Sequence, residues 1–316
     1  MRIALQMDPP DELNYKKDST FVIALEAQKR GHDLFYYNAQ SLALKGGILS
    51  AAIAPVQFSR NEGSHYKLGN VSRETLLSFD MILMRNDFND PLSYNAAAHL
   101  LDHVSQKVLI LNDPKGVRES PEKMLITHYP ELAPKTLITR DLEQIREFFE
   151  DEGDIIIKPL NGFGGNDIHH VKNADDLARV YEEMSAQHTE PFVIQEFLPA
   201  VSEGDKRIIV VEGEPIAALN RIPKDENSRA NLAQGGKAAK AEITDREREI
   251  CKILKSELIK RGLVFVGLDV IGGKVTEINP KSPTGLQQIY EFDGIKCEEA
   301  IWDAFEKRYE DFRRNK

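Results

Sequence analysis

The chain has 316 residues, of which 41% are hydrophobic and 29% charged, and its formal net charge is −10 at pH 7. This length exceeds one typical domain, so two or three packed subdomains are expected. The negative charge argues against a nucleic-acid or anionic-membrane partner, and no apolar run reaches the length of a membrane span. Cys251 and Cys297 lack metal-type spacing, so we expect reduced thiols with no catalytic role in a cytoplasmic protein.

The first 118 residues are predicted to form an open parallel-sheet α/β domain. Residues 3–7 read as a buried strand, a helix capped by Asp18 or Ser19 runs to about Arg30, and residues 34–37 read as a second strand. Further elements are expected as strands at residues 81–84 and 108–111 and a helix at residues 91–106. No G-x-G-x-x-G follows a strand, so a dinucleotide fingerprint is absent.

A second unit, residues 119–200, is predicted to be a small α+β lobe. Ser120 and Pro121 indicate an N-cap and the first position of a helix that carries Lys123. Lys123 would bind an anion there or be an ordinary surface lysine. The remaining elements are expected as strands at residues 136–138, 155–158 and 192–197 and helices at residues 142–150 and 174–185.

Two segments of this lobe suggest a nucleotide. Lys158 ends a β-branched strand, and the loop behind it contains Gly162, Gly164 and Gly165, whose backbone amides could approach phosphates closely. The alternative is a tight turn. The strand that ends at Pro199 would leave the backbone of its last residues free to bind an adenine edge, unless this is a simple strand end. The residues of this linker are Gln195, Glu196, Phe197 and Leu198.

The third unit, residues 201–316, begins with a predicted hairpin, with strands at residues 207–211 and 215–220. Asp205 and Arg207 enter this hairpin and Arg221 leaves it, so the guanidinium groups could face an anion or lie on the surface. Residues 222–240 lack periodicity and are interpreted as a lid loop that carries Arg229. Thr244 and Glu247 form a capping box that starts a structural helix.

A second hairpin in this unit, residues 267–279, places Asp269, Glu277 and Asn279 on two apolar strands joined by glycines. Oxygen ligands beside a phosphate pocket suit Mg²⁺, whereas the plain alternative is a hairpin with surface acids. A two-residue turn would pair Asp269 with Thr276, and a three-residue loop at residues 272–274 would pair Asp269 with Glu277. A shared metal requires the second arrangement. Ser282 and Thr284 follow and could bind a carboxylate.

In their order along the chain, these features resemble those of ATP-grasp enzymes, and more narrowly the prokaryotic-type glutathione synthetases. The resemblance covers nearly the whole chain. The matching segments are Asp8-Pro9, Lys16 to Ser19, Met84-Arg85, Lys158-Pro159-Leu160, Asp205-Lys206-Arg207, Arg221-Ile222-Pro223, Arg229 to Gly236, Phe265 to Asp269, and Glu277 to Thr284. Pro280, Lys281 and Gly285 depart from the pattern, which affects the amino-acid pocket.

The resemblance implies ATP-dependent ligation of γ-glutamylcysteine to glycine through an acyl phosphate. It implies that ATP is bound by Lys123, Lys158, the glycine loop, the Gln195 to Leu198 linker and Asp205, and that Mg²⁺ or Mn²⁺ is bound by Asp269, Glu277 and Asn279. Developing negative charge would be stabilised by Arg207, Arg221 and Lys158. The substrates would be bound by Ser19, Arg85, Arg221, Arg229, Ser282 and Thr284. A homotetramer is also implied. The alternatives are another ligase of the same fold, which joins a carboxylate to an amine, and a non-catalytic ATP-binding regulator.

Overall fold

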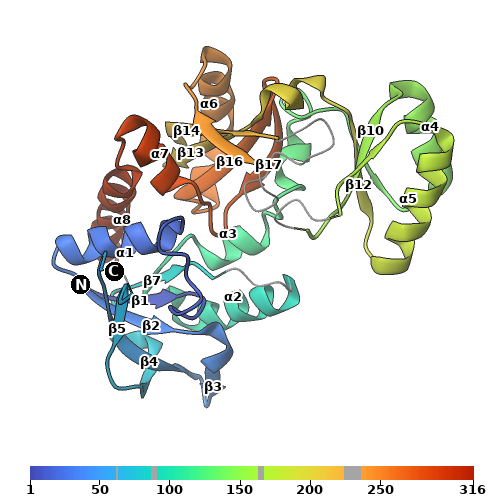
Figure 1. Cartoon of the computed structure of the whole chain (residues 1–316). Coiled ribbons are helices and arrows are strands. Elements are labelled where there is room, and N and C mark those ends of the chain that lie inside the picture. Colours follow the sequence, from blue (N-terminus) through green and yellow to red (C-terminus); the bar gives the residue numbers. More distant parts are fainter. Residues whose placement is uncertain (62, 87–90, 163–166, 224–235) are drawn as a thin grey trace.

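The structure of the chain is a computed structural model that describes residues 1–61, 63–86, 91–162, 167–223 and 236–316. Three β-sheets organise these residues, with eight, four and five strands, and the four-stranded sheet with its helices projects from the rest (Figure 1). No helix in the described ranges has both the length and the apolar character needed to cross a bilayer.

The N-terminal residues form the eight-stranded sheet. Six of its strands follow the order β3-β4-β2-β1-β7-β8, and β5 and β6 each pair with β4 outside this order. β1 runs parallel to β2 and β7, and β7 runs parallel to β8, which confirms the predicted parallel sheet. The antiparallel strands β3 to β6 were not predicted, because Pro55 and several alanines interrupt the strand pattern of β4. The bounds are β1 (Arg2–Gln6), β2 (Asp33–Tyr37), β3 (Ala43–Lys45), β4 (Ile48–Phe58), β5 (Tyr66–Leu68), β6 (Ser72–Thr75), β7 (Met81–Met84) and β8 (Leu109–Leu111).

Helices cover both faces of this sheet. In β1, Ile3 and Leu5 join one apolar cluster with α1, whereas Ala4 joins another with α2, because alternate strand residues point to opposite faces. Asp18 caps α1 and accepts a hydrogen bond from the Phe21 amide. The helices of this region are α1 (Ser19–Lys29), α2 (Pro91–Ser105) and α3 (Pro114–Arg118), with short 3₁₀ helices η1 (Ala39–Ser41) and η2 (Leu76–Ser78).

The four-stranded sheet, in the order β11-β10-β12-β9, forms the small lobe with α4 and α5. In β10, Ile155 and Ile157 pack into the apolar cluster under these helices, so Lys158 points to the other face. Strand β11 was not predicted, because it has only three residues. The bounds are β9 (Thr136–Thr139), α4 (Leu142–Glu152), β10 (Ile155–Pro159), β11 (His169–Val171), α5 (Ala174–Gln187) and β12 (Phe192–Glu196).

The five-stranded antiparallel sheet, in the order β15-β14-β13-β16-β17, forms the large lobe. One face packs on α6, whose predicted capping box of Thr244 and Glu247 is confirmed, and the other face packs on α7 and α8. The bounds are η4 (Pro199–Glu203), β13 (Asp205–Val211), β14 (Glu214–Ile222), β15 (Lys237–Lys240), α6 (Asp245–Lys260), β16 (Phe265–Ile271), β17 (Lys274–Asn279), α7 (Leu286–Asp293) and α8 (Cys297–Arg314).

Two local predictions are wrong. Residues 237–240 are not part of a loop but form β15, which pairs with the end of β14. No α-helix begins at Pro121, because the chain makes a turn at residues 122–124 and then the short 3₁₀ helix η3 (Leu125–His128). This turn instead bonds to the large lobe, since the Ile278 amide donates to the carbonyl of Glu122 at 2.9 Å.

Candidate active site

The hairpin of β16 and β17 places Asp269 opposite Glu277, and Asn279 follows two residues later on the same face. Both turn alternatives drawn from the sequence were incomplete. The turn has two residues, Gly272 and Gly273, both with positive φ, so Ile271 pairs with Lys274. A register shift after Asp269 inserts Thr276 as an extra residue, and this bulge brings the two carboxylates onto one face.

Gly267 makes room for an arginine across this sheet. A Cβ at residue 267 would lie 2.9 Å from Arg207 Cδ and 3.1 Å from Pro283 Cβ. Glycine is therefore needed for close approach rather than for an unusual backbone angle, and the Arg207 side chain passes over this position toward Asp269.

Three buried charged side chains, Arg207, Arg221 and Asp269, meet the partly buried Asp205 beside it, on β13, β14 and β16. Arg207 Nη2 donates to Asp269 Oδ2 at 3.0 Å, and Arg221 Nη2 lies 3.1 Å from the same oxygen and 2.6 Å from Asp205 Oδ2. Arg207, Arg221 and Asp269 are 8%, 4% and 5% exposed. Such ions are tolerated only because each one has an opposite charge in contact.

The pKa of Asp269 follows from these contacts. Burial alone would raise it, but the Arg207 and Arg221 guanidinium groups hold the pKa of this carboxyl well below its usual range. Asp269 is therefore an anion at neutral pH, as a metal ligand must be.

Two lysines from different segments converge on Glu277. Its Oε1 lies 3.5 Å from Lys123 Nζ and 3.7 Å from Lys158 Nζ, and both lysines are 5% exposed. Burial lowers the pKa of Lys158, although the Glu277 carboxylate opposes this shift. The predicted cations of the middle section and the predicted metal hairpin therefore share one cleft.

The glycine loop after β10 is only partly described. Lys123 Nζ donates to the carbonyl of Gly162 at 2.6 Å, which ties the start of this loop to the two lysines. Gly164 and Gly165 lie outside the described residues, as do Arg229 and residues 224–235 of the predicted lid.

The Gln195 to Leu198 linker differs in part from the prediction. The amide of Glu196 donates to the Lys135 carbonyl at 3.1 Å, and the amide of Phe197 donates to the backbone carbonyl of Asp154 at 2.9 Å, so neither amide is free. Within the described part of the chain, the Leu198 amide makes no hydrogen bond. The His170 ring stacks on Phe197 with centroids 3.9 Å apart, which gives the linker an aromatic wall.

The N-terminal sheet contributes Ser19 and Arg85 to the other end of the cleft. The Leu286 amide donates to Ser19 Oγ at 3.3 Å, and Arg85 Nη2 donates to the Pro283 carbonyl at 3.2 Å. Ser282, between β17 and α7, has a buried Oγ without a hydrogen-bond partner in the described residues, whereas Thr284 is exposed. These predicted substrate residues therefore gather around residues 282–286.

Sequence reasoning missed Asn112, which holds the chain at Pro280, just before the substrate segment, and at Val264 and Phe265 at the start of β16. Its Nδ2 donates to the carbonyls of Phe265 and Pro280, both at 2.7 Å, and its Oδ1 accepts from the amides of Val264 and Phe265. The one available signal in the sequence is a polar residue directly after a buried strand.

The two cysteines are remote from this cleft. Both Cys251 and Cys297 are buried free thiols, and burial raises the pKa of each to about 12. Neither is a thiolate at neutral pH, which agrees with their expected lack of a catalytic role.

Asp269, Glu277 and Asn279 fit a hard divalent cation by their chemistry. Two carboxylates and one amide share a face, and their oxygens, Asn279 Oδ1 included, are the kind of ligand that such a cation takes. No third histidine, cysteine, aspartate or glutamate joins them in the part that the structure describes. A sparse oxygen set suits a cation that also takes ligands from phosphates.

Family models match most of the chain. The model described as prokaryotic glutathione synthetase, N-terminal domain, matches residues 1–118, and the model for the ATP-grasp domain of the same family matches residues 122–294. The glutathione synthetase of Brucella melitensis is 42% identical over 98% of this chain and 99% of the relative. That of Mesorhizobium japonicum is 43% identical over 97% of this chain and 98% of the relative.

Solved structures support the fold alone, because their sequences are distant. The D-cycloserine synthetase DcsG matches with a TM-score of 0.70 at 13% identity, covering 98% of this chain and 100% of that chain. The ATP-grasp ligase PsnB, complexed with minimal precursor, Mg and ADP, matches with a TM-score of 0.64 at 17% identity, covering 98% of both chains. The three-sheet arrangement is therefore an ATP-grasp fold.

Proposed function

The chain belongs to the prokaryotic glutathione synthetase family, and on this premise we propose how its buried charges carry out the reaction. It is an ATP-dependent ligase of glutathione synthesis that forms a peptide bond. We propose that the acid is γ-glutamylcysteine and the amine is glycine.

The proposed reaction has two steps. A carboxylate oxygen of γ-glutamylcysteine attacks the γ-phosphorus of ATP, which forms an acyl phosphate and breaks the bond to ADP. The glycine nitrogen then attacks the acyl carbon, loses a proton, and displaces inorganic phosphate. No protein nucleophile is needed, so the protein contributes positioning and electrostatic stabilisation.

The lysines and the linker are assigned to the nucleotide. Lys123 and Lys158 would hold its phosphates, together with Gly162, Gly164 and Gly165. The Leu198 amide, which has no partner in the described ranges, and the stacked Phe197 ring support an adenine site at the Gln195 to Leu198 linker. Asp205 would act through Arg221, its ion-pair partner.

The arginines are assigned to the reacting groups. Arg207 and Arg221 would stabilise negative charge on the acyl phosphate and on the tetrahedral adduct, and Asp269 fixes both guanidinium groups in advance. Ser19, Arg85, Ser282 and Thr284 would hold the substrates, with Arg229 as a further candidate.

The proposed units are an N-terminal domain of residues 1–118, a small lobe of residues 119–200 and a large lobe of residues 201–316.

Asp269, Glu277 and Asn279 would hold the divalent cation, for which we propose Mg²⁺ with Mn²⁺ as the alternative. When bound, the ion supplies charge neutralisation of the phosphates. Lys123 and Lys158 lie 3.5 and 3.7 Å from Glu277, beyond hydrogen-bond distance, so this carboxylate can be shared with a cation.

One observation carries the proposal: Lys123, Lys158 and Glu277 come from three segments far apart in sequence and meet in one cleft beside the Asp269 cluster. A hairpin with surface acids does not require buried lysines at that place. A triphosphate with its metal does, because both cations and oxygen ligands must reach it.

The test is a coupled assay of ADP release with γ-glutamylcysteine and a panel of amino acids. We expect turnover with glycine, loss of activity in Lys158→Ala and Asp269→Asn, and the tripeptide as product. Turnover with a different acid and amine would indicate another ATP-grasp ligase. ATP binding without ADP release for any pair would indicate a regulator.

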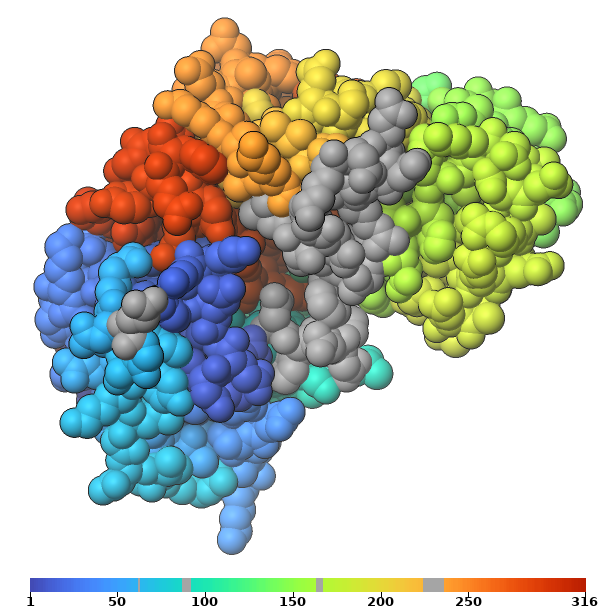
Figure 2. All heavy atoms as spheres, in the orientation of Figure 1, coloured from blue at the N-terminus to red at the C-terminus, as the bar shows by residue number. Residues whose placement is uncertain are grey.

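We also propose a cytoplasmic homotetramer. Its support is the family resemblance and the exposed apolar side chains of Leu44 on β3, Ile48 on β4 and Val71 just before β6. In Figure 2, the β3–β4 hairpin projects from the lower edge of the molecule. Light scattering of the purified protein measures the oligomeric state, and a monomer at micromolar concentration would contradict the tetramer.

A further inference from the structure

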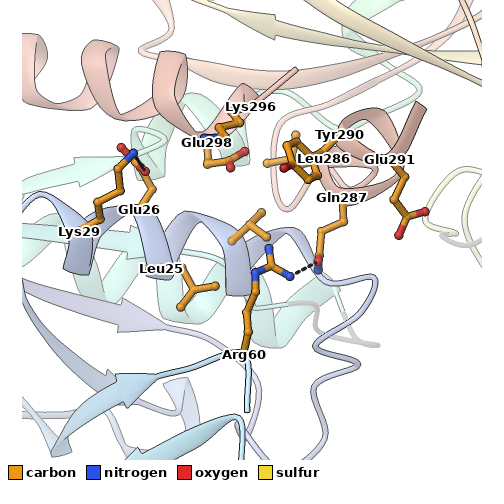
Figure 3. Close-up of a pocket in the computed structure, with 11 residues that line it drawn as sticks. Leu25, Glu26, Lys29, Arg60, Leu286, Gln287, Tyr290, Glu291, Lys296 and Glu298 are labelled. Atoms are coloured by element: carbon orange, nitrogen blue, oxygen red, sulfur yellow. Dashed lines mark hydrogen bonds and ion pairs between the residues drawn. The ribbon is translucent and has the colours of Figure 1, made fainter. Parts of the chain in front are cut away.

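A second cleft lies between α1 of the N-terminal domain and the segment from α7 to the start of α8 (Figure 3). It has a volume of about 530 Å³, which falls within the range of small-molecule sites. None of the residues proposed above for ATP, metal or substrate lines it. The cleft therefore needs an explanation of its own.

One part of the cleft wall is apolar. Val22 and Leu25 project from α1, and Leu286 faces them from α7. Val22 is 3% exposed, Leu286 is fully buried, and the Tyr290 ring is 48% exposed beside them. This surface would pack against methylene groups or a small side chain of a ligand.

Some charges around the cleft are already neutralised within the protein. Glu26 Oε2 binds Lys29 Nζ at 3.0 Å, and Glu26 Oε1 binds Arg30 Nε at 2.9 Å. Lys29 also binds Glu299 at 3.0 Å. These side chains are less available to a ligand, because each already has a partner of opposite charge.

Three other charged side chains of the wall, Arg60, Glu291 and Glu298, make no ion pair within the described residues. Arg60 reaches only the neutral amide oxygen of Gln287, at 3.4 Å, and the face of the Phe21 ring, and it has no carboxylate partner in the described residues. The Glu298 carboxyl lines another part of the wall and makes no ion pair within the same residues. Burial raises the pKa of Glu298. The helix dipole favours an acid such as Glu298 in the first turn of α8, but it does not explain why this acid lines a cleft.

We propose that this cleft binds a small zwitterionic amino acid or short peptide, with a carboxylate on Arg60, an ammonium group on Glu298, and apolar atoms on Val22, Leu25 and Leu286. An unpaired guanidinium and an unpaired carboxylate beside the apolar part of one cleft match the two ends of such a ligand. This binding does not depend on the reaction proposed above.

The cleft is joined to the proposed substrate side through Gln287. The Gln287 Nε2 donates to the carbonyls of Tyr15 and Asp18 at 2.9 and 2.7 Å, while its Oε1 contacts Arg60. Ser19, which follows Asp18 in the chain, accepts a hydrogen bond from the Leu286 amide through its Oγ. A ligand that takes Arg60 away from Gln287 therefore acts on the side chain that holds residues 15–19. This coupling, unlike the binding, rests on the proposed role of Ser19.

Trp302 provides a direct reporter of binding. It is the only tryptophan in the chain, it is fully buried in α8, and its Nε1 donates to the Ile23 carbonyl of α1 at 2.7 Å. The ring therefore links α8, whose first turn lines the cleft, to α1 on the opposite wall. Glutathione, a zwitterionic peptide, is titrated against Trp302 emission without nucleotide, with calorimetry on the same samples in case the emission is silent.

We expect saturable binding of glutathione that Arg60→Met and Glu298→Gln each weaken roughly tenfold to a hundredfold, the effect of one charge-assisted hydrogen bond. N-acetylglutathione, which lacks the ammonium group, should bind less tightly than glutathione. The matched controls Arg73→Met and Glu310→Gln remove exposed charges of the same kind outside the cleft and should leave the dissociation constant unchanged. Ser282→Ala tests the reaction site and should also leave it unchanged.

Three results would overturn the inference. These are no binding by either method, equal affinity in wild type, Arg60→Met and Glu298→Gln, and loss of binding in Ser282→Ala, which would place the peptide in the reaction site. Urea unfolding of each variant verifies that it is folded. Since ADP release is measured separately, failure of the cleft and failure of the proposed ligase reaction give different results.

Discussion

The two walls of the reaction cleft hold their charges in different ways. On the large lobe, Arg207, Arg221, Asp205 and Asp269 neutralise one another within a single sheet. On the small lobe, Lys158 finds its nearest carboxylate on the other lobe, at Glu277. The large lobe is therefore organised before any substrate arrives, whereas the small lobe depends on how closely the two lobes approach.

The most damaging change to this arrangement should be Arg221→Met. It leaves the buried carboxylate of Asp269 and the partly buried carboxylate of Asp205 without the cation that they share, so we expect a loss of about 3–5 kcal/mol in the free energy of unfolding. Urea unfolding measures this loss. Arg179→Met, which removes an exposed arginine from a helix, is the matched control and should have no measurable effect. Equal stability of the two variants would show that the charge cluster is not needed for folding.

Lys158→Met tests the other wall. Because burial lowers the pKa of Lys158 and Lys123 remains beside Glu277, we expect little loss of stability. Affinity for a nonhydrolysable ATP analogue should fall roughly tenfold to a hundredfold, the effect of one charge-assisted contact. Calorimetric titration measures the affinity, with Lys172→Met on the same lobe as the control. A large loss of stability with unchanged affinity would reverse the contrast between the walls.

Gly267→Ala disturbs the large lobe without removing a charge. The added Cβ would crowd Arg207 and Pro283, and overpacking of this kind costs about 1–3 kcal/mol. Because Arg207 must shift, kcat should fall more than the affinity for ATP. Steady-state kinetics and thermal unfolding measure both effects. An unchanged kcat would mean that the position of Arg207 does not limit the reaction.

The smallest effect concerns pH. The folded pKa of Asp269 is depressed, so its stabilising contribution is fully present above the ordinary aspartate pKa of about 3.9 and is lost as pH falls from there toward the folded pKa. Wild type should therefore lose about 1.4 kcal/mol per pH unit more than Asp269→Asn within that window. Urea unfolding over an acid series measures the difference, and parallel curves would contradict the depressed pKa.

The regular parts of this molecule were predictable from local patterns. The capping box of Thr244 and Glu247 and the parallel strands follow from spacing alone. The shared face of Asp269 and Glu277 was one of two arrangements that the sequence left open. The bulge at Thr276 was not predictable, because a two-residue turn and an extra residue together give the same pairing as a longer loop. The helix predicted to carry Lys123 is instead a turn, because a tertiary hydrogen bond between Glu122 and Ile278 competes with the local helix signal.

The contacts made by Asn112 and Gln287 could not have been predicted either. Each side chain satisfies backbone groups more than a hundred residues away, and such partners leave no periodic trace in the sequence. Asn112 lies directly after β8, and Gln287 lies in α7 just after the substrate segment. Long-range polar contacts of this kind depend on the folded arrangement of the sheets.

Helix α8 has a consequence for recombination between relatives. It follows the residues matched by the ATP-grasp family model, yet Trp302, Ile301 and Phe305 share an apolar cluster with α1 and β1 of the N-terminal domain. A chimera that exchanges residues 1–118 alone would set a foreign surface against this C-terminal helix. Grafts that carry both ends of the chain together should therefore remain in solution more often than grafts cut at the family boundary.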